Sequence, residues 1–147
     1  MSARTRRLAL SLVGVLAVSA GACGGDEGGS VDVTLQEFAV IPSVSEISAG
    51  SVEFTATNEG PEDDHEFVVF KTDLAPDALP TLENGAVDEE GEGVELIGEI
   101  EEFPVGETET ASFDLDAGNY VFICNIYDED EQESHYQEGM RVAFTVT

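Results

Sequence analysis

The stretch GNYVFIC at residues 118–124 decides the fold class of this 147-residue chain. From Tyr120 onward it is a continuous apolar run, which is typical of a strand in the interior of a sheet. The Ala-Gly-Asn at residues 117–119 predicts a turn. Other short segments also have strand patterns. Most of them alternate apolar and polar residues, as half-buried strands do. We expect these further strands at residues 31–35, 51–57, 65–71, 111–115 and 141–147.

Many short strands with regular turns predict an all-β sandwich or barrel. Residues 31–147 suffice for one domain with a core between two sheets. Residues 72–102 fit this pattern less well. Within them, residues 73–80 leave room for a helical turn, and the acid-rich residues 88–93 predict a solvated loop.

The N-terminus does not belong to this domain. Three Arg residues, the last of them Arg7, precede an apolar segment at residues 8–20, and small residues follow. This is the pattern of a secretory signal peptide at residues 1–22, and its apolar segment is too short for a permanent membrane span. Because the small residues stop at Cys23, the segment resembles a bacterial lipoprotein signal.

That resemblance implies that Cys23 is lipidated and anchors the protein to the outer face of the cytoplasmic membrane. Residues 23–30 would then form a flexible tether, because a Gly-rich polar chain cannot offset the entropy of ordering itself. The alternative is an ordinary secreted protein with Cys23 in a free tail. In that case Cys23 and Cys124 could form a disulfide.

Metal-binding side chains are scarce and unevenly distributed. Beyond Cys23 the chain has one further Cys, one Met and both of its His residues, namely His65, Cys124, His135 and Met140. Two imidazoles, a thiolate and a weak axial thioether form the ligand set of blue-copper electron-transfer sites. The sulfur ligands favour Cu(I) and the imidazoles accept Cu(II), so we expect one copper ion and one-electron transfer.

Three passages resemble the cupredoxin family, the relatives of plastocyanin and azurin. They are TNEG at residues 57–60 followed by His65, GNYVFIC ending at Cys124, and HYQEGM running from His135 to Met140. The resemblance covers residues 31–147 and implies a Greek-key β-sandwich with a mononuclear type 1 copper site. By position, His65, Cys124 and His135 would be equatorial ligands and Met140 a weak axial one. The protein would be an electron carrier and not an enzyme.

The sequence departs from the family in two places. Ten residues, 125–134, separate Cys124 from His135, where the family usually has two to four. Glu66 stands where many members have an Asn that helps to tie the Cys loop, and an ionised carboxylate cannot donate a hydrogen bond. The sulfur surroundings, and with them the reduction potential, are therefore expected to differ.

Other functions remain open at this point. A long loop between Cys124 and His135 favours a copper chaperone or scavenger, because a flexible site exchanges metal more readily. Zinc also binds Cys and His. Taken singly, Cys124 could be a buried structural thiol, His135 a surface residue and Met140 a core residue of a metal-free sandwich used in adhesion. Cysteine catalysis would need an orienting third group, and none is marked.

The charge of the chain restricts its partners. All 32 acidic residues follow Cys23, and only Lys71 and Arg141 are basic there. Nucleic acid is excluded because its phosphates would be repelled. The acidity fits either a salt-rich environment, where charges are screened, or a surface that attracts a basic redox partner such as a cytochrome. The acidic residues 128–133 lie beside the expected site and could steer such a partner to the protein, which we expect to be a monomer.

Overall fold

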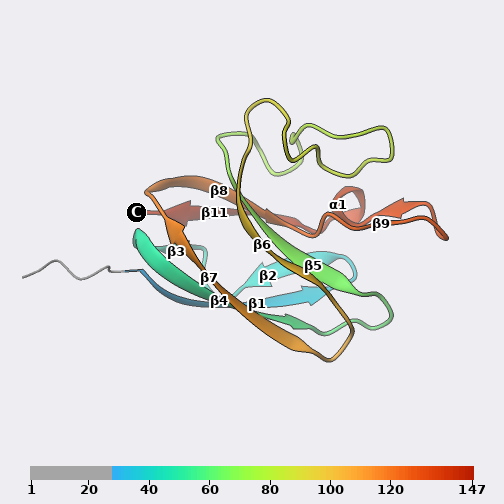
Figure 1. Cartoon of the computed structure of the whole chain (residues 1–147), viewed down its shortest axis with the longest axis horizontal. Coiled ribbons are helices and arrows are strands. Elements are labelled where there is room, and N and C mark those ends of the chain that lie inside the picture. Colours follow the sequence, from blue (N-terminus) through green and yellow to red (C-terminus); the bar gives the residue numbers. More distant parts are fainter. Residues whose placement is uncertain (1–27) are drawn as a thin grey trace, which may run out of the picture.

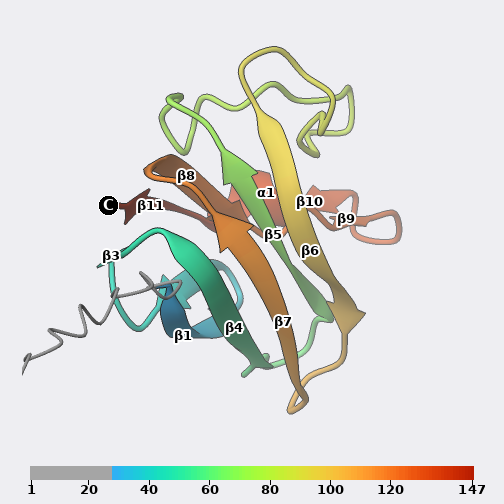
Figure 2. The same ribbon diagram turned by 60° about the vertical axis from the view of Figure 1, so that its left-hand side comes forward.

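The computed structural model describes residues 28–147, so the expected signal peptide, Cys23 and residues 24–27 lie outside the described residues. The described chain is a β-sandwich of two sheets with a small hairpin beside it (Figures 1 and 2). The first sheet has the order β2 (Ala39–Pro42), β1 (Gly29–Gln36), β4 (Gly50–Asn58), β7 (Thr108–Leu115). The second has the order β3 (Glu46–Ile47), β11 (Arg141–Val146), β8 (Gly118–Ile123), β5 (His65–Lys71), β6 (Glu95–Phe103). The hairpin pairs β9 (Tyr127–Asp128) with β10 (Glu133–Ser134), and the short helix α1 (His135–Glu138) follows it.

The expected strands and the all-β sandwich are confirmed. β5 has the expected bounds, whereas β1 begins two residues early, so Gly29 and Ser30 pair with Val52 and Glu53 instead of belonging to the tether. The strands β2, β3 and β6, the hairpin of β9 and β10, and the helix α1 were not expected from the sequence. The sequence pattern did not mark β6 as a strand, because it is an edge strand with exposed acidic residues and only Ile100 and Phe103 buried.

The expected helical turn at residues 73–80 is wrong in its details. The segment has one hydrogen-bonded turn, from Ala75 to Ala78, and no helix. Residues 72–94 instead form a long excursion that lies over the outer face of the second sheet (Figure 2). Its buried Leu79 and Val87 pack there, so this part of the chain has a small apolar cluster of its own.

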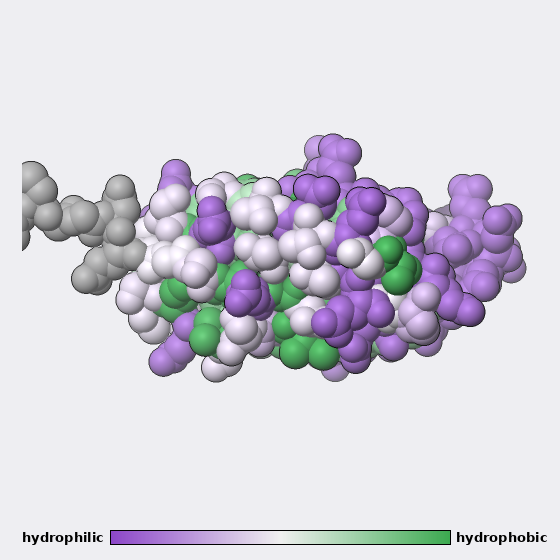
Figure 3. Space-filling model, turned by 90° about the horizontal axis from the view of Figure 1, so that it is seen from below, coloured by the Kyte–Doolittle hydropathy of each residue, from purple (hydrophilic) through white to green (hydrophobic). Residues whose placement is uncertain are grey.

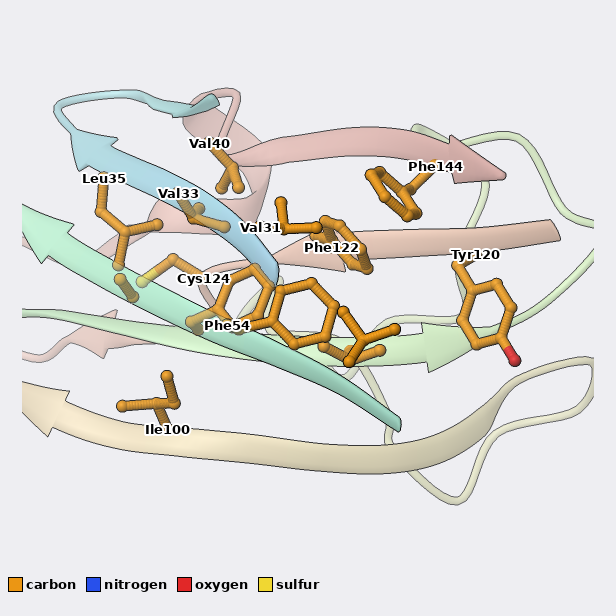
Figure 4. Close-up of a cluster of buried hydrophobic side chains, with 14 of the residues drawn as sticks. Val31, Val33, Leu35, Val40, Phe54, Ile100, Tyr120, Phe122, Cys124 and Phe144 are labelled. Atoms are coloured by element: carbon orange, nitrogen blue, oxygen red, sulfur yellow. The ribbon is translucent and has the colours of Figure 1, made fainter. Parts of the chain in front are cut away.

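The continuous apolar run in β8 has a simple cause, since both faces of this strand are buried. Phe122 points into the core between the sheets, where its ring contacts Phe54 with centroids 5.4 Å apart. Val121 and Ile123 point the other way, under the excursion. β1 has only one buried face and alternates accordingly, with Val31, Val33 and Leu35 at most 1% exposed. Figure 4 shows the core, with the Cys124 sulfur among its apolar side chains.

Strand direction brings three chain segments to one end of the sandwich. β8 is antiparallel to β5, with Ile123 opposite Val68, and antiparallel to β11, with Ile123 opposite Arg141. The last residue of β8 therefore lies beside the first residue of β11 and the fourth residue of β5. Figure 1 shows this end next to α1 and β9, opposite the C-terminus. None of the helices among residues 28–147 has the length and apolar character needed to cross a membrane.

Candidate metal centre

Three of the four expected ligands meet at this end of the sandwich. The Cys124 Sγ lies 3.4 Å from His135 Nδ1 and 3.9 Å from His65 Nδ1, and the two Nδ1 atoms are 3.2 Å apart. His65 and Cys124 are fully buried, and His135 is 2% exposed. Within the described residues these three form the one group of His, Cys and acidic side chains whose donor atoms converge tightly enough to hold a metal ion.

His135 reaches the site because residues 125–134 form a hairpin and not an open loop. The Asp128 carboxylate accepts hydrogen bonds from the backbone N–H groups of Asp130 and Glu131, which close its turn. At its base, the His135 N–H donates to the carbonyl of Ile126 at 3.0 Å. The ten residues between Cys124 and His135 are therefore a hydrogen-bonded hairpin.

Helix α1 fixes the direction of His135. Ser134 caps its N-terminus by accepting from the N–H of Gln137, and the Ser134 hydroxyl donates to the carbonyl of Gly85 in the excursion. Arg141 donates to the carbonyls of Tyr136 and Gln137 at the other end. Both ends of the helix that begins with His135 are therefore hydrogen-bonded to other segments.

Met140 lies in the expected place, although its role as a ligand stays a prediction. Its side chain is fully buried in the same apolar cluster as Cys124. Its carbonyl accepts from the Cys124 N–H at 3.1 Å, and its N–H donates to the His135 carbonyl at 3.0 Å. Met140 thus joins the backbones of Cys124 and His135.

The turn before His65 is fixed by Asn58. Its Oδ1 accepts from the N–H of Gly60 at 2.8 Å, and its amide nitrogen donates to the carbonyls of Asp63 and Phe103. Asn58 is fully buried, so these bonds are shielded from water. The Asn-x-Gly motif therefore sets where β5 begins and where His65 lies.

Burial keeps the donor groups uncharged in the metal-free protein. It raises the pKa of the Cys124 thiol to about 12, although the Glu66 N–H donates to the sulfur at 3.5 Å. Burial also lowers the pKa of His65 and of His135, and His135 lowers that of His65 further. Neutral imidazoles have free lone pairs, so only the thiol must lose a proton for a metal to bind.

Two acidic residues near the site have roles that the sequence did not reveal. Glu66 was expected to disturb the surroundings of the sulfur because it cannot donate, but its carboxylate accepts from the Asn125 N–H at 2.9 Å. Glu37 lies behind His65, with its Oε1 3.9 Å from Nε2 of that ring. No local sequence signal marks Glu37, because the pair depends on a contact between the two sheets.

A depression of about 290 Å³ leads from the surface to His135. Apart from His135 and Ile126 its lining is entirely acidic, namely Glu62, Asp63, Asp64, Glu102 and Asp128. Figure 3 shows hydrophilic side chains gathered at the same end of the molecule, where Figure 1 places β9 and α1. A molecule that approaches His135 along this path therefore meets negative charge first.

The donor set fits a soft or borderline metal ion. Two imidazole nitrogens and a thiolate suit copper and zinc, while the hard ions calcium and magnesium prefer oxygen. The structure supports this fit with one more observation, since Nε2 of His65 is buried and has no hydrogen-bond partner among the described residues. A neutral imidazole that binds metal through Nδ1 must carry its proton on the other nitrogen, Nε2.

No family model and no curated protein sequence matches the chain. Several solved structures do match it. Reduced auracyanin from the photosynthetic bacterium Roseiflexus castenholzii has a TM-score of 0.54 at 19% identity, covering 84% of this chain and 99% of that one. Auracyanin A, a blue copper protein from Chloroflexus aurantiacus, has 0.54 at 18% identity, covering 82% and 100%. Rusticyanin from Thiobacillus ferrooxidans has 0.52 at 16% identity, covering 80% and 76%.

These similarities extend over most of the described domain and over three quarters or more of each matched chain. At such identities they establish the fold, which agrees with the sandwich and with the family resemblance of the three sequence passages. The described part of the chain therefore has the cupredoxin fold.

Proposed function

We propose that this domain is a one-electron carrier that holds a single type 1 copper ion. His65, Cys124 and His135 would be the equatorial ligands, with Met140 as a weak axial ligand. The observation that carries the proposal is the convergence of the Cys124 sulfur and two imidazole Nδ1 atoms within 3.2–3.9 Å of one another. Copper bound there would accept one electron from a reduced protein donor and pass it to an oxidised acceptor.

The chain's own contribution is to hold these ligands in one arrangement. Cys124 is held by its backbone bond to Met140, His135 by α1 and the hairpin, and His65 by the turn of Asn58. A site that changes little between Cu(II) and Cu(I) loses little energy to rearrangement during electron transfer. The ordered hairpin favours this carrier over a chaperone, which would need a ligand that can leave.

The visible and electron paramagnetic resonance spectra of the Cu(II)-loaded protein test the proposal. We expect an intense thiolate-to-copper charge-transfer band, which Cys124→Ser abolishes. Met140→Leu should keep the band and shift the reduction potential. If copper binds without that band, or passes rapidly as Cu(I) to a chelator, the carrier is contradicted and a copper chaperone or scavenger takes its place.

We further propose that a basic redox protein, such as a cytochrome, docks over the acidic depression beside His135. Opposite charges speed such encounters, and salt weakens the effect. Neutralising acids at this end should lower the association rate and flatten its salt dependence. The test set is Glu62→Gln, Asp64→Asn, Glu129→Gln and Glu131→Gln, and the matched control of equal charge at the far end is Glu46→Gln, Glu53→Gln, Asp114→Asn and Asp116→Asn. Equal effects of both sets would contradict docking at this end.

We also propose that the protein acts outside the cytoplasmic membrane as a monomer, anchored through lipidated Cys23. This rests on the signal pattern at residues 1–22. Mass spectrometry of the protein extracted from membranes should show a diacylglyceryl group at Cys23, and Cys23→Ser should release the protein in soluble form. Unmodified protein in the soluble fraction would contradict the anchor.

A further inference from the structure

One polar atom at the site has no hydrogen bond. His65 Nε2 lacks a hydrogen-bond partner among the described residues. Because the ring is fully buried, bulk water does not supply one. The opposite ring nitrogen, Nδ1, faces Cys124 and His135. If Nδ1 binds a metal, Nε2 carries a proton and needs an acceptor, because a buried N–H without a partner is destabilising.

The side chain of Glu37 is placed to be that acceptor. Its Oε1 lies 3.9 Å from His65 Nε2, and the side chain is 11% exposed. The same oxygen accepts from the N–H groups of Glu62 at 2.9 Å and Asp63 at 2.6 Å, so the carboxylate is held facing the ring. An approach of about 1 Å between the ring and the carboxylate would bring Nε2 to hydrogen-bond distance.

We propose that Glu37 is a positioning residue for the metal centre, whose carboxylate accepts the Nε2–H of His65 when Nδ1 binds copper. This rests on the proposed function. A carboxylate behind a ligating imidazole fixes the ring and makes it a stronger electron donor. Stronger donation favours Cu(II) over Cu(I), so Glu37 lowers the reduction potential.

Glu37 differs from Asp64, another acidic residue near His65, because its side chain is mostly buried and faces the ring nitrogen Nε2. Asp64 precedes His65 in the chain and bears the same charge, but its side chain is exposed. Its field acts through water and is screened by salt. Asp64→Asn is therefore a matched control, since it removes one nearby negative charge without removing an acceptor from Nε2.

The test compares Glu37→Gln, Glu37→Asp and Asp64→Asn by reductive titration of the copper protein. Glu37→Gln keeps an oxygen for the N–H groups of Glu62 and Asp63 but loses the charge. We expect it to raise the potential clearly more than Asp64→Asn at high salt. Glu37→Asp keeps the charge but withdraws it from the ring, so it should also raise the potential. Equal shifts in Glu37→Gln and Asp64→Asn, or an unchanged potential in Glu37→Asp, would overturn the proposal.

A second readout needs no copper. In the zinc-loaded protein, nuclear magnetic resonance should show a slowly exchanging His65 Nε2–H, and its exchange should quicken in Glu37→Asp, which withdraws the acceptor from the ring, but not in Asp64→Asn. Unchanged exchange in Glu37→Asp would overturn the role of Glu37 while leaving the copper function intact. Conversely, a wild-type copper protein without the charge-transfer band would contradict the proposed function, and the zinc experiment would still decide the role of Glu37.

Discussion

The carboxylate of Glu66 accepts a hydrogen bond of 2.9 Å from the backbone N–H of Asn125. Through its own backbone N–H, Glu66 also donates to the Cys124 sulfur at 3.5 Å. One residue of β5 thus holds both the Cys124 sulfur and the backbone of the residue that follows it. The Asn125 side chain extends this link to Val87 and Glu89 in the excursion. The Glu66 carboxylate therefore links β5 to the segment after Cys124 as a hydrogen-bond acceptor, and the backbone N–H of Asn125 is the donor.

Glu66 should make the stability of the metal-free protein depend on pH. Burial raises its pKa from 4.5 to about 7. Because the folded state then binds the proton more tightly than the unfolded state, the free energy of unfolding falls as pH rises from about 4.5 to about 7. Glu66→Gln keeps an acceptor for Asn125 and should be more stable than wild type by roughly 2 kcal/mol above about pH 8.

Urea unfolding at about pH 5 and about pH 8 checks this expectation. The gain of Glu66→Gln should be small at the lower pH and full at the higher one. Glu53→Gln in β4 is an exposed neutralisation that reports the general relief of charge repulsion. A gain in Glu66→Gln no larger than that of Glu53→Gln would show that burial of the carboxylate costs nothing.

Metal binding should release one proton at neutral pH. The pKa of Cys124 is raised to about 12 by burial, so the thiol is protonated before metal binds. The histidines add no proton, because burial lowers the pKa of both. Zinc titration calorimetry in two buffers of different ionisation enthalpy should yield about one proton per ion. Cys124→Ser should abolish that release, and heats that do not depend on the buffer in wild type would argue against the thiolate ligand.

The Tyr136 hydroxyl should hold the excursion onto the second sheet. It donates to the Pro76 carbonyl at 2.8 Å and accepts from the Leu79 N–H at 3.2 Å. Tyr136→Phe leaves both groups unpaired and should lower the free energy of unfolding by about 1–3 kcal/mol. Thermal or urea unfolding measures the loss. Tyr127→Phe in the surface hairpin is the matched control, and an equal loss in both variants would rule out this role.

Salt should stabilise the described domain. The chain has 32 acidic residues against five basic ones, and repulsion among them favours the unfolded chain. At about 1 M NaCl the Debye length falls to about 3 Å, so this repulsion is largely screened. We expect the melting temperature to rise by several degrees between dilute buffer and about 1 M NaCl. A melting temperature that did not change would remove the support for a salt-rich environment and leave partner attraction as the reason for the acidity.

Much of the fold could be predicted because strand patterns are local. Alternation in β1 and the continuous apolar run in β8 each report which faces of one strand are buried. The acid-rich β6 could not be recognised in this way, because an edge strand with few buried residues resembles a solvated loop. The hairpin at residues 125–134 was missed for a related reason, since its order comes from the turn of Asp128 and the bond between His135 and Ile126.

The sequence by itself determined the donor inventory and the strands that carry it, because composition and periodicity are properties of neighbouring residues. Only the tertiary structure decided that His65 lies 3.9 Å from a sulfur 59 residues further along the chain, since antiparallel register sets which strand ends meet. It alone also revealed the contacts of Glu37 with His65 and of Glu66 with Asn125. Such contacts depend on how two sheets and a hairpin pack together, and no local pattern records that packing.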